Sequence, residues 1–391
     1  FVVMHTNGLH EVALSFCACT AEFVEPRDQL MRHRWWPATT VDPQTAATME
    51  VLDAFDAHGG AGKHNAHDFY KALVVMSDGE GLEELPDRSK EFFRMAHERR
   101  HLLQAKRAGR GHDITGIAGT GRGELAVECP TCPDDAIEQV VEDHWLTSMD
   151  RALATVKWMM DCNFRSKNVE NNSTKETSPY LGDGMAYLVP EEEYDKFTLN
   201  SKYQDEMSSC SRFGAMLMAN MKQGRGMRTT GIGAVFCMHG YFWPNCVGTL
   251  VKGERYCTMD FILACAVMRI RVRAANLAYD IICQYTRNLY RRMGDVEPQS
   301  YIYPGARAIL ERIQFTFGIG KFHLPGHKEL CRNWLSLTFI LHGGMNDGEG
   351  AERAWAGLNP AASSMREMGP GTMRNTIDFY CGFWNWQKFV G

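Results

Sequence analysis

Residues 157–164, KWMMDCNF, decide the fold, because a single carboxylate, Asp161, interrupts an otherwise apolar run there. Residues 276–285, NLAYDIICQY, repeat this arrangement around Asp280. An ionised carboxylate inside an apolar strand is costly unless it is paired or binds a metal ion. Two such strands in one chain therefore predict a buried acidic site that binds a cation.

A third acidic position lies in residues 346–355, NDGEGAERAW. Glu349 and Glu352 are one helical turn apart and face the same way on a helix. With Asp161 and Asp280 they could hold two Mg²⁺ or Mn²⁺ ions, one activating water or a 3′-hydroxyl and the other stabilising the leaving oxygen. The alternative is structural, because an Asp at a strand end also caps helices or pairs with an arginine.

The order of the expected elements indicates one fold class. Apolar runs predict strands at 158–164, 185–189 and 231–239, a helix at 260–268, a strand at 275–283, a helix to residue 293, a strand at 313–322 and a helical region from residue 328. Three strands, helix, strand, helix, strand, helix is the order of the ribonuclease-H-like fold, which is α/β. We interpret the polar residues 171–223 as an insertion in it.

The beginning of the chain has a different pattern. We expect a strand at 9–16 and helices at 45–57, 65–76 and 87–108, with a break after the first helix at Gly59-Gly60. Residues 109–135 are rich in glycine and proline and predict a domain boundary. The sequence therefore predicts a smaller, mostly helical domain at 1–110 and a catalytic domain at 111–391.

Composition limits the classes of partner. The chain has 391 residues, enough for two or three domains, and 42 basic against 47 acidic residues give a net charge of −5. Binding to nucleic acid must then come from local basic patches. The 13 scattered cysteines are typical of a reducing compartment. The apolar run at 261–268 is far shorter than the roughly 18 residues of a membrane span, so no membrane partner is expected.

A series of motifs follows the chain from end to end: GLHEVALSFCAC, WWPATTVDPQTAAT, RHLLQAKRAGRGHD, ECPTCP, MDCNFRS, TGIGAVFCMHG, VKGERYCTMDF, AYDIICQYTRNL, KFHLPGHKELC, NDGEGAERAWAGLNP and FWNWQK. In this order they resemble the Kyakuja-Dileera-Zisupton (KDZ) transposases. The first part resembles the trailing half of the cysteine-cluster domain that accompanies these enzymes. Its leading zinc ligands are absent and the chain begins at Phe1, so we expect a piece of a longer protein.

The resemblance implies a DNA transposase with a ribonuclease-H-like domain and a DDE-type metal site. It implies two-metal phosphodiester hydrolysis and strand transfer, with Asp161 as the first carboxylate and Asp280 as the second. The third is Glu349 or Glu352, and the run from Glu352 to Trp355 is similar to the last catalytic motif of hAT transposases, which favours Glu352. The implied partner is DNA and the implied location is the nucleus, and a homo-oligomer stays open.

Cysteines and histidines form groups that could bind Zn²⁺. The pairs Cys17-x-Cys19 and Cys129-x-x-Cys132 would supply four thiolates if the fold joins them. For each group the alternative is a set of ordinary buried or turn residues. The remaining candidates are Cys237 and His239 with Cys246, and the series His323, His327 and Cys331.

Basic segments could contact DNA phosphates. Residues 94–110 are strongly basic, and a solvated helix face explains them equally well. Because a transposase must hold DNA near its metal ions, the better candidates lie in the catalytic domain: Lys222, Arg225, Arg228, Arg269, Arg271 and Arg273.

Two rival functions stay open from the sequence. An inactive or domesticated transposase would bind DNA or zinc without cutting. A metal-dependent nuclease would cut without strand transfer.

Overall fold

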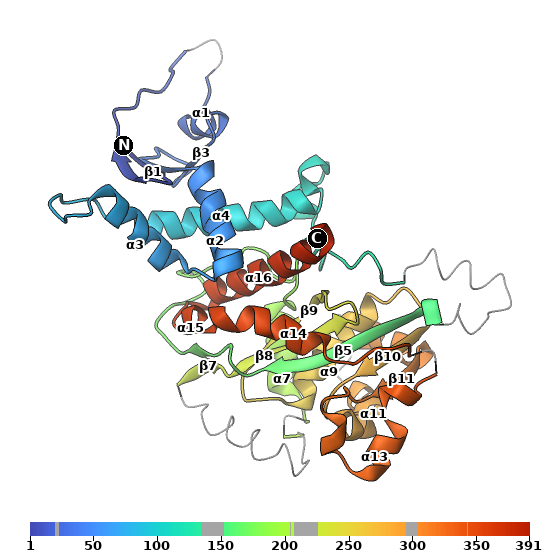
Figure 1. Cartoon of the computed structure of the whole chain (residues 1–391). Coiled ribbons are helices and arrows are strands. Elements are labelled where there is room, and N and C mark those ends of the chain that lie inside the picture. Colours follow the sequence, from blue (N-terminus) through green and yellow to red (C-terminus); the bar gives the residue numbers. More distant parts are fainter. Residues whose placement is uncertain (20–22, 134–151, 204, 207–225, 295–302, 342) are drawn as a thin grey trace. The chain divides into compact units, whose positions relative to one another are not determined.

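The computed structural model describes residues 1–19, 23–133, 152–203, 205–206, 226–294, 303–341 and 343–391 (Figure 1). The chain divides into two compact units, Phe1–Lys106 and Arg107–Gly391. No helix in the described ranges is long and apolar enough to cross a membrane.

The first unit combines a small sheet with helices. Its strands are β1 (Val2–His5), β2 (Gly8–Glu11), β3 (Trp35–Pro37) and β4 (Thr45–Thr48), in the order β2-β1-β4-β3 with β1 parallel to β4. Its helices are α1 (Pro26–Arg32), α2 (Met49–Gly62), α3 (Ala66–Ser77) and α4 (Ser89–Arg107). The side chains of Met4, Phe55, Leu73 and Phe92 form the centre of its core.

Three expectations for this unit are wrong in detail. The strand expected at 9–16 is the shorter β2, which ends at Glu11 and pairs with the unexpected strand β1. The helix expected from residue 45 begins at Met49, because Thr45–Thr48 form the buried strand β4 and the Thr48 hydroxyl accepts the Val51 N–H at 3.3 Å as an N-cap. Gly59-Gly60 do not break α2, because both glycines are buried within it. The helix ends instead at Lys63, whose φ of 58° is left-handed.

A five-stranded sheet forms the centre of the second unit. Its strands are β5 (Thr155–Asn163), β8 (Gly231–Cys237), β9 (Phe242–Leu250), β10 (Ala274–Ala278) and β11 (Gln314–Gly318), in the order β11-β10-β5-β8-β9. The strands β5, β8 and β9 are antiparallel, and β10 runs parallel to both β5 and β11. A separate pair, β6 (Asn168–Val169) and β7 (Met227–Thr229), lies outside this sheet.

The sheet follows the expected order of strands and helices, but one of its first three strands is formed by a different segment from the one expected. Residues 185–189 do not form a named strand, although they lie along β9 through an isolated parallel bridge from Leu188 to Val247 and backbone hydrogen bonds such as that from the Val247 N–H to the Tyr187 carbonyl at 2.9 Å. The third strand is β9, which the sequence hides because Pro244, Asn245 and Gly248 are unusual inside a strand. They fit here because β9 is an edge strand.

The part of this unit that the structure describes contains several α-helices. They are α7 (Glu191–Asn200), α9 (Tyr256–Met268), α10 (Ile282–Tyr285), α11 (Leu289–Gly294), α12 (Tyr303–Arg312), α13 (Glu329–Trp334), α14 (Gly350–Leu358), α15 (Ala362–Met365) and α16 (Pro370–Val390). Of these, α7 lies in the segment interpreted as an insertion, and the helical region expected from residue 328 is four separate helices.

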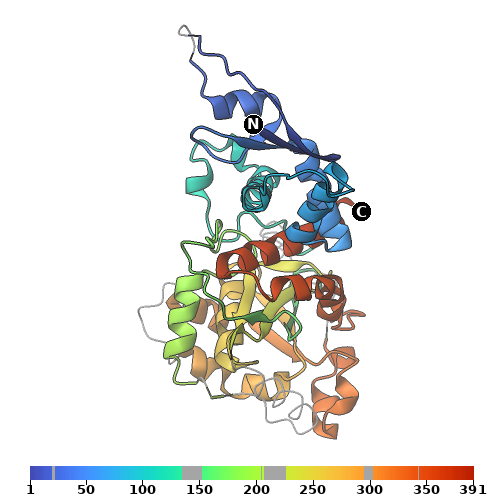
Figure 2. The ribbon, with the colours of Figure 1, turned by 90° about the vertical axis from the view of Figure 1, so that its left-hand side faces the viewer.

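Side chains of β5 alternate between the two faces of the sheet. Trp158, Met160 and Cys162 belong to the core shared with α9, which is buried along almost its whole length. Met159 and Asp161 face the other way, where the Gly350 N–H and α14 lie. Figure 2 shows α14 and α16 together on that side of the sheet. Asp161 thus lies between the sheet and α14.

A buried ion pair joins two helices of this core. Arg292 of α11 donates from Nε to Oδ2 of Asp260 in α9 at 2.6 Å and from Nη2 to Oδ1 at 3.0 Å. Both side chains are almost fully buried, and Arg292 also donates to the Tyr285 carbonyl at 3.0 Å. Two parallel hydrogen bonds match the planar guanidinium to the carboxylate.

We expect Asp260→Asn to lower the free energy of unfolding by about 3–5 kcal/mol, because it removes the carboxylate that pairs with two nitrogens of the buried Arg292 and leaves the more exposed Glu206, 3.4 Å from Nη1, as its charged partner. Urea denaturation measures the change. The control is Glu311→Gln, which breaks the exposed Arg307–Glu311 pair on α12 and should cost less than about 1 kcal/mol. Equal losses in the two variants would contradict the assigned role of the buried pair.

Candidate active site and metal centres

The pairing of β5 with β10 brings the two aspartates together. The strands are parallel with Ala278 opposite Met159, so Asp280 comes level with Asp161 two residues farther on. Strand β10 ends at Ala278, and Asp280 lies in the turn that follows; the strand expected at 275–283 is therefore too long. The turn leaves the Asp280 side chain at the end of the strand, where it is not fixed by the pleat.

Asp161 is half-buried and held in one orientation. The indole N–H of Trp355 in α14 donates to its Oδ2 at 2.8 Å. Burial raises the pKa of Asp161 well above its ordinary value, and the neighbouring charges of Asp280, Glu352 and Glu254 raise it further. The carboxylate form at this position therefore calls for a cation.

The carboxylate form of Asp280 also calls for a cation. Burial raises its pKa, the Glu352 charge adds to the effect, and a His323 charge opposes it. Its Oδ1 atom is buried without a hydrogen-bond partner among the residues that the structure describes. A buried carboxylate oxygen without a donor is the ligand atom that a hard cation requires.

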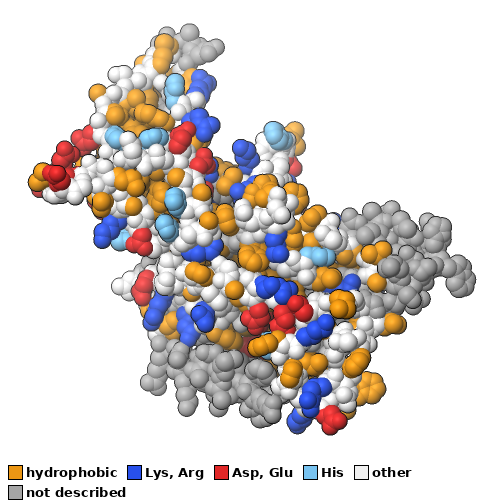
Figure 3. Space-filling view, viewed as in Figure 1, with side chains coloured by type: hydrophobic (Ala, Val, Ile, Leu, Met, Phe, Trp, Pro, Cys, Tyr) orange, Lys and Arg blue, Asp and Glu red, His pale blue; other side chains and the backbone are white. Residues whose placement is uncertain are grey.

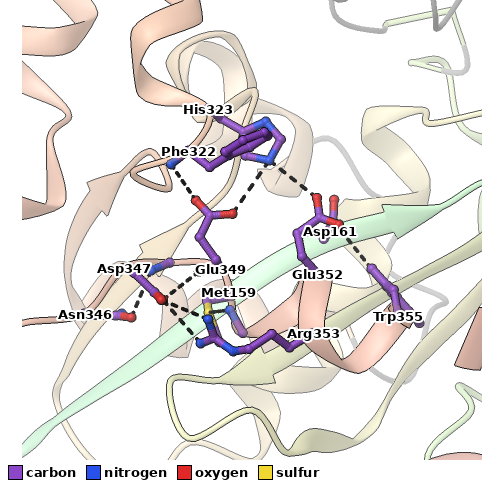
Figure 4. A network of polar contacts seen from close by, with 12 residues as sticks. Met159, Asp161, Phe322, His323, Asn346, Asp347, Glu349, Glu352, Arg353 and Trp355 are labelled. Carbon is purple, nitrogen blue, oxygen red and sulfur yellow. Dashed lines mark hydrogen bonds and ion pairs between the residues drawn. The ribbon is translucent and has the colours of Figure 1, made fainter. Parts of the chain in front are cut away.

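Glu349 and Glu352 meet at the ring of His323 (Figure 4). The Nε2 atom of His323 lies 3.5 Å from Oε1 of Glu352 and 3.9 Å from Oε2 of Glu349. The hydrogen bond between His323 and Glu352 raises the pKa of His323 and lowers that of Glu352. Glu349 also accepts the Phe322 N–H at 2.9 Å, so it has a structural task in joining two loops.

A fifth acid, Glu254, was not expected from the sequence. It lies between β9 and α9, is buried, and accepts a hydrogen bond from the Tyr279 hydroxyl. Burial and the charge of Asp280 raise its pKa to about 8. The motif VKGERYC gave no local signal for this, because a glutamate in a polar loop is ordinarily solvated.

These residues could hold a divalent cation. Three elements supply the carboxylates: β5 carries Asp161, the turn after β10 carries Asp280, and the first turn of α14 carries Glu352. The charges of Asp280 and Glu352 raise the pKa of Asp161, and a charge on His323 lowers the pKa of Asp280 and of Glu352. The group is more open than the two tight clusters of metal-binding residues described below, which are built from Cys and His. Figure 3 shows acidic side chains gathered around α14 with Lys and Arg side chains beside them.

One tight cluster joins Cys129, Cys132, Cys237 and His239, whose ligand atoms all lie within 4.8 Å of one another. The two sulfurs of the C-x-x-C pair lie 3.4 and 3.6 Å from Nδ1 of His239. A tetrahedral zinc ion with ordinary bond lengths separates sulfur from nitrogen by about 3.6 Å. These four residues could therefore hold a metal such as zinc.

Local structure explains this cluster. Strand β8 ends at Cys237, and the turn to β9 reverses at Gly240 with φ of 75°, which places His239 beside the last residue of the strand. Asn385 of α16 donates to the Val127 carbonyl at 2.8 Å and anchors the segment that carries the C-x-x-C pair. Burial raises the pKa of the Cys237 thiol to about 12, and a bound cation would reverse that shift.

The structure corrects two expected zinc groupings. The C-x-x-C pair lies beside Cys237 and His239 of its own unit, so these two residues take the places expected for Cys17 and Cys19. The thiols of Cys17 and Cys19 are exposed, with their sulfurs 2.9 Å apart. Cys246 does not join Cys237 and His239, because it is buried in the core.

The second tight cluster also differs from the expected one. It contains His327 and Cys331, but its third member is Cys283 and not His323. His323 turns instead toward Glu349 and Glu352, because a short 3₁₀ turn at Leu324–Gly326, which contains Pro325, separates the two histidines.

The basic residues expected to contact DNA differ in their surroundings. Arg228 donates to Oδ1 of Asn168 at 2.7 Å, and Arg269 donates to the Arg122 carbonyl at 2.7 Å, so both work within the fold. Arg271 and Arg273 are exposed. Lys222 and Arg225 lie outside the described residues.

The basic segment at the end of the first unit also serves the fold. Arg99 and Arg100 both form ion pairs with Asp56 of α2, at 3.2 and 2.8 Å. These contacts favour a structural role for that segment.

Comparison with protein families identifies the chain. Residues 154–385, more than half of it, match the family described as Kyakuja-Dileera-Zisupton transposase. The chain belongs to the KDZ transposase family. Residues 1–81 match the CxC2-like cysteine cluster associated with KDZ transposases. Both matches confirm the resemblance read from the motifs. No curated protein and no solved structure matches the chain.

The KDZ match covers both the acidic group and half of the first Cys/His cluster. Asp161, Asp280 and Glu352 lie inside it, as do Cys237 and His239, whereas the C-x-x-C pair precedes it. Membership in a transposase family implies that the chain binds DNA.

We expect Cys237→Ala to lower the zinc content of the purified chain by about one equivalent, because it removes one of four ligands. Metal analysis after dialysis measures the loss. Cys246→Ala is the matched control, since Cys246 is equally buried on the neighbouring strand but outside the cluster. If both variants keep the zinc of the parent, this cluster is not its site.

Proposed function

We propose that this chain is a DNA transposase that cuts and joins phosphodiester bonds with divalent cations held by Asp161, Asp280 and Glu352. The register of β5 and β10, which sets the two aspartates level at adjacent strand ends, carries the proposal. Numbered by their order along the chain, the five strands of the sheet lie in the order 3-2-1-4-5, which is β9-β8-β5-β10-β11. Three antiparallel strands followed by two parallel ones support a ribonuclease-H-like fold. In such α/β sheets, ligands bind beyond the carboxyl ends of parallel strands.

Electrostatics favour Glu352 over Glu349 as the third carboxylate. The charge of Glu352 raises the pKa of both Asp161 and Asp280, whereas that of Glu349 is not among the main causes for either. Glu349 is also occupied by the Phe322 N–H. Glu352 is about half exposed and lies in the first turn of α14, so it faces both the aspartates and the solvent.

The other residues of the group position these carboxylates. Trp355 fixes one oxygen of Asp161, and His323 holds Glu352 toward the aspartates. Glu254 accepts a hydrogen bond from the hydroxyl of Tyr279, the residue before Asp280, and burial together with the Asp280 charge raises its pKa to about 8. When bound, Mg²⁺ or Mn²⁺ would activate water or a 3′-hydroxyl and stabilise the leaving oxygen.

The partner in this proposal is DNA. Arg271 and Arg273 are exposed, but they precede β10 and so lie at the opposite end of that strand from Asp280. They are therefore candidates for phosphate contacts away from the carboxylates. The zinc ion proposed at Cys129, Cys132, Cys237 and His239 is structural, since all four positions of a tetrahedral ion are filled. With DNA as its substrate, the protein is proposed to act in the nucleus.

We expect the chain to nick supercoiled plasmid in the presence of Mn²⁺, and Asp161→Asn and Asp280→Asn to slow nicking more than about 100-fold. The expected loss exceeds the 10- to 100-fold cost of removing only an outer partner of a metal ligand. Gel separation of nicked circles measures the rate, and exposed Glu311→Gln is the control. Nicking that survives in Asp280→Asn would contradict the site. Binding without nicking by the parent chain would favour the rival DNA-binding function.

The choice of third carboxylate has its own test. We expect Glu352→Gln to weaken Mn²⁺ binding by at least about tenfold, and Glu349→Gln to weaken it less, because only Glu352 acts on both aspartates. Electron paramagnetic resonance of free Mn²⁺ during titration measures both affinities. The reverse order would assign the third position to Glu349.

A further inference from the structure

Three residues near the acidic group form a metal-binding arrangement of their own. The ligand atoms of Cys283, His327 and Cys331 lie within 4.8 Å of one another. The Cys283 sulfur is 3.7 Å from Nδ1 of His327. That separation agrees with the roughly 3.6 Å between sulfur and nitrogen ligands of a tetrahedral zinc ion.

The surroundings of the three residues suit a bound ion. His327 is only 5% exposed, and the two cysteines are half-buried. Thiolate and imidazole are the ligands that zinc prefers, and three protein ligands leave one position for water. A divalent ion would also compensate two thiolates that are otherwise costly so close together.

A second observation concerns the elements that carry the three ligands. Cys283 lies in α10, three residues after Asp280, whereas His327 precedes α13 and Cys331 lies within it. An ion bound by all three residues would therefore join the turn that carries Asp280 to α13.

We propose that Cys283, His327 and Cys331 bind a zinc ion that fastens the turn carrying Asp280 to the segment before α13. Zinc binding stands on this geometry alone. The positioning role rests on the function proposed above, because it concerns the orientation of Asp280.

The segment fastened in this way also reaches the third carboxylate. His323, four residues before His327, contacts Glu352, and the N–H of Phe322 donates to Glu349 at 2.9 Å. The Lys321 N–H donates to the Asp347 carbonyl at 2.8 Å. One ion at His327 would therefore hold the Asp280 turn and the loop before α14 in a fixed relation.

The test is the zinc content of the full chain and of two histidine variants. We expect His327→Ala to lose about one equivalent relative to the parent, and His323→Ala to lose none, because only His327 lies in the cluster. Since the result is a difference from the parent, zinc at Cys129, Cys132, Cys237 and His239 does not affect it. Equal zinc in His327→Ala and the parent would overturn the proposal.

A ligand exchange separates metal binding from folding. Cys331→His keeps a zinc ligand in place and should retain the equivalent that Cys331→Ala loses. Cobalt substitution gives a second readout, because the intensity of the Co²⁺–thiolate absorption should fall in Cys331→Ala and partly in Cys331→His. Zinc loss in both variants with native circular dichroism would overturn the assignment, as would a Cys283–Cys331 disulfide in the chain purified under reducing conditions.

The two proposals fail separately. Asp280→Asn should keep all its zinc, because its side chain is not a ligand, while it loses nicking. His327→Ala should lose zinc and also nick at least about tenfold more slowly, as expected when a positioning element is lost. A parent chain that holds this zinc without nicking DNA would support the zinc site and contradict the proposed function.

Discussion

The burial of two carboxylates at adjacent strand ends is the constraint on which the second unit depends. Parallel pairing of β10 with β5 sets Asp280 level with Asp161, and burial raises the pKa of both. The fold compensates part of this cost with the Trp355 indole and the His323 ring. The rest, including the buried Oδ1 of Asp280, calls for a cation. The arrangement costs stability and is therefore best explained by function.

Helix α14 and the loop before it complete the arrangement from the other end of the chain. The Trp355 indole and the Glu352 carboxylate are one helical turn apart, so a single helix supplies both the group that orients Asp161 and the candidate third ligand. The helix approaches closely because Gly350 has no side chain: a Cβ there would lie 2.5 Å from the Met159 methyl carbon. Segments almost 200 residues apart in the sequence thus meet at one site.

Much of this was predictable from the sequence, and the failures have physical causes. A lone Asp in an apolar run is a strong signal because burial makes it costly, so Asp161 and Asp280 could be singled out. Glu254 could not, since a glutamate in a polar loop looks solvated until the fold buries it. Strand β9 was missed because an edge strand tolerates Pro244. Cys283 was missed as a ligand because it lies 44 residues before His327, and sequence spacing reveals only partners on one helix or turn.

The position of a divalent cation in this group of carboxylates is the most direct test. A crystal of the chain soaked with Mn²⁺ and measured for anomalous scattering would locate the ion directly. We expect an anomalous peak in contact with Asp161, Asp280 and Glu352, with Trp355 still donating to the other oxygen of Asp161. A peak bound elsewhere, with the two aspartates bare, would contradict the proposed site.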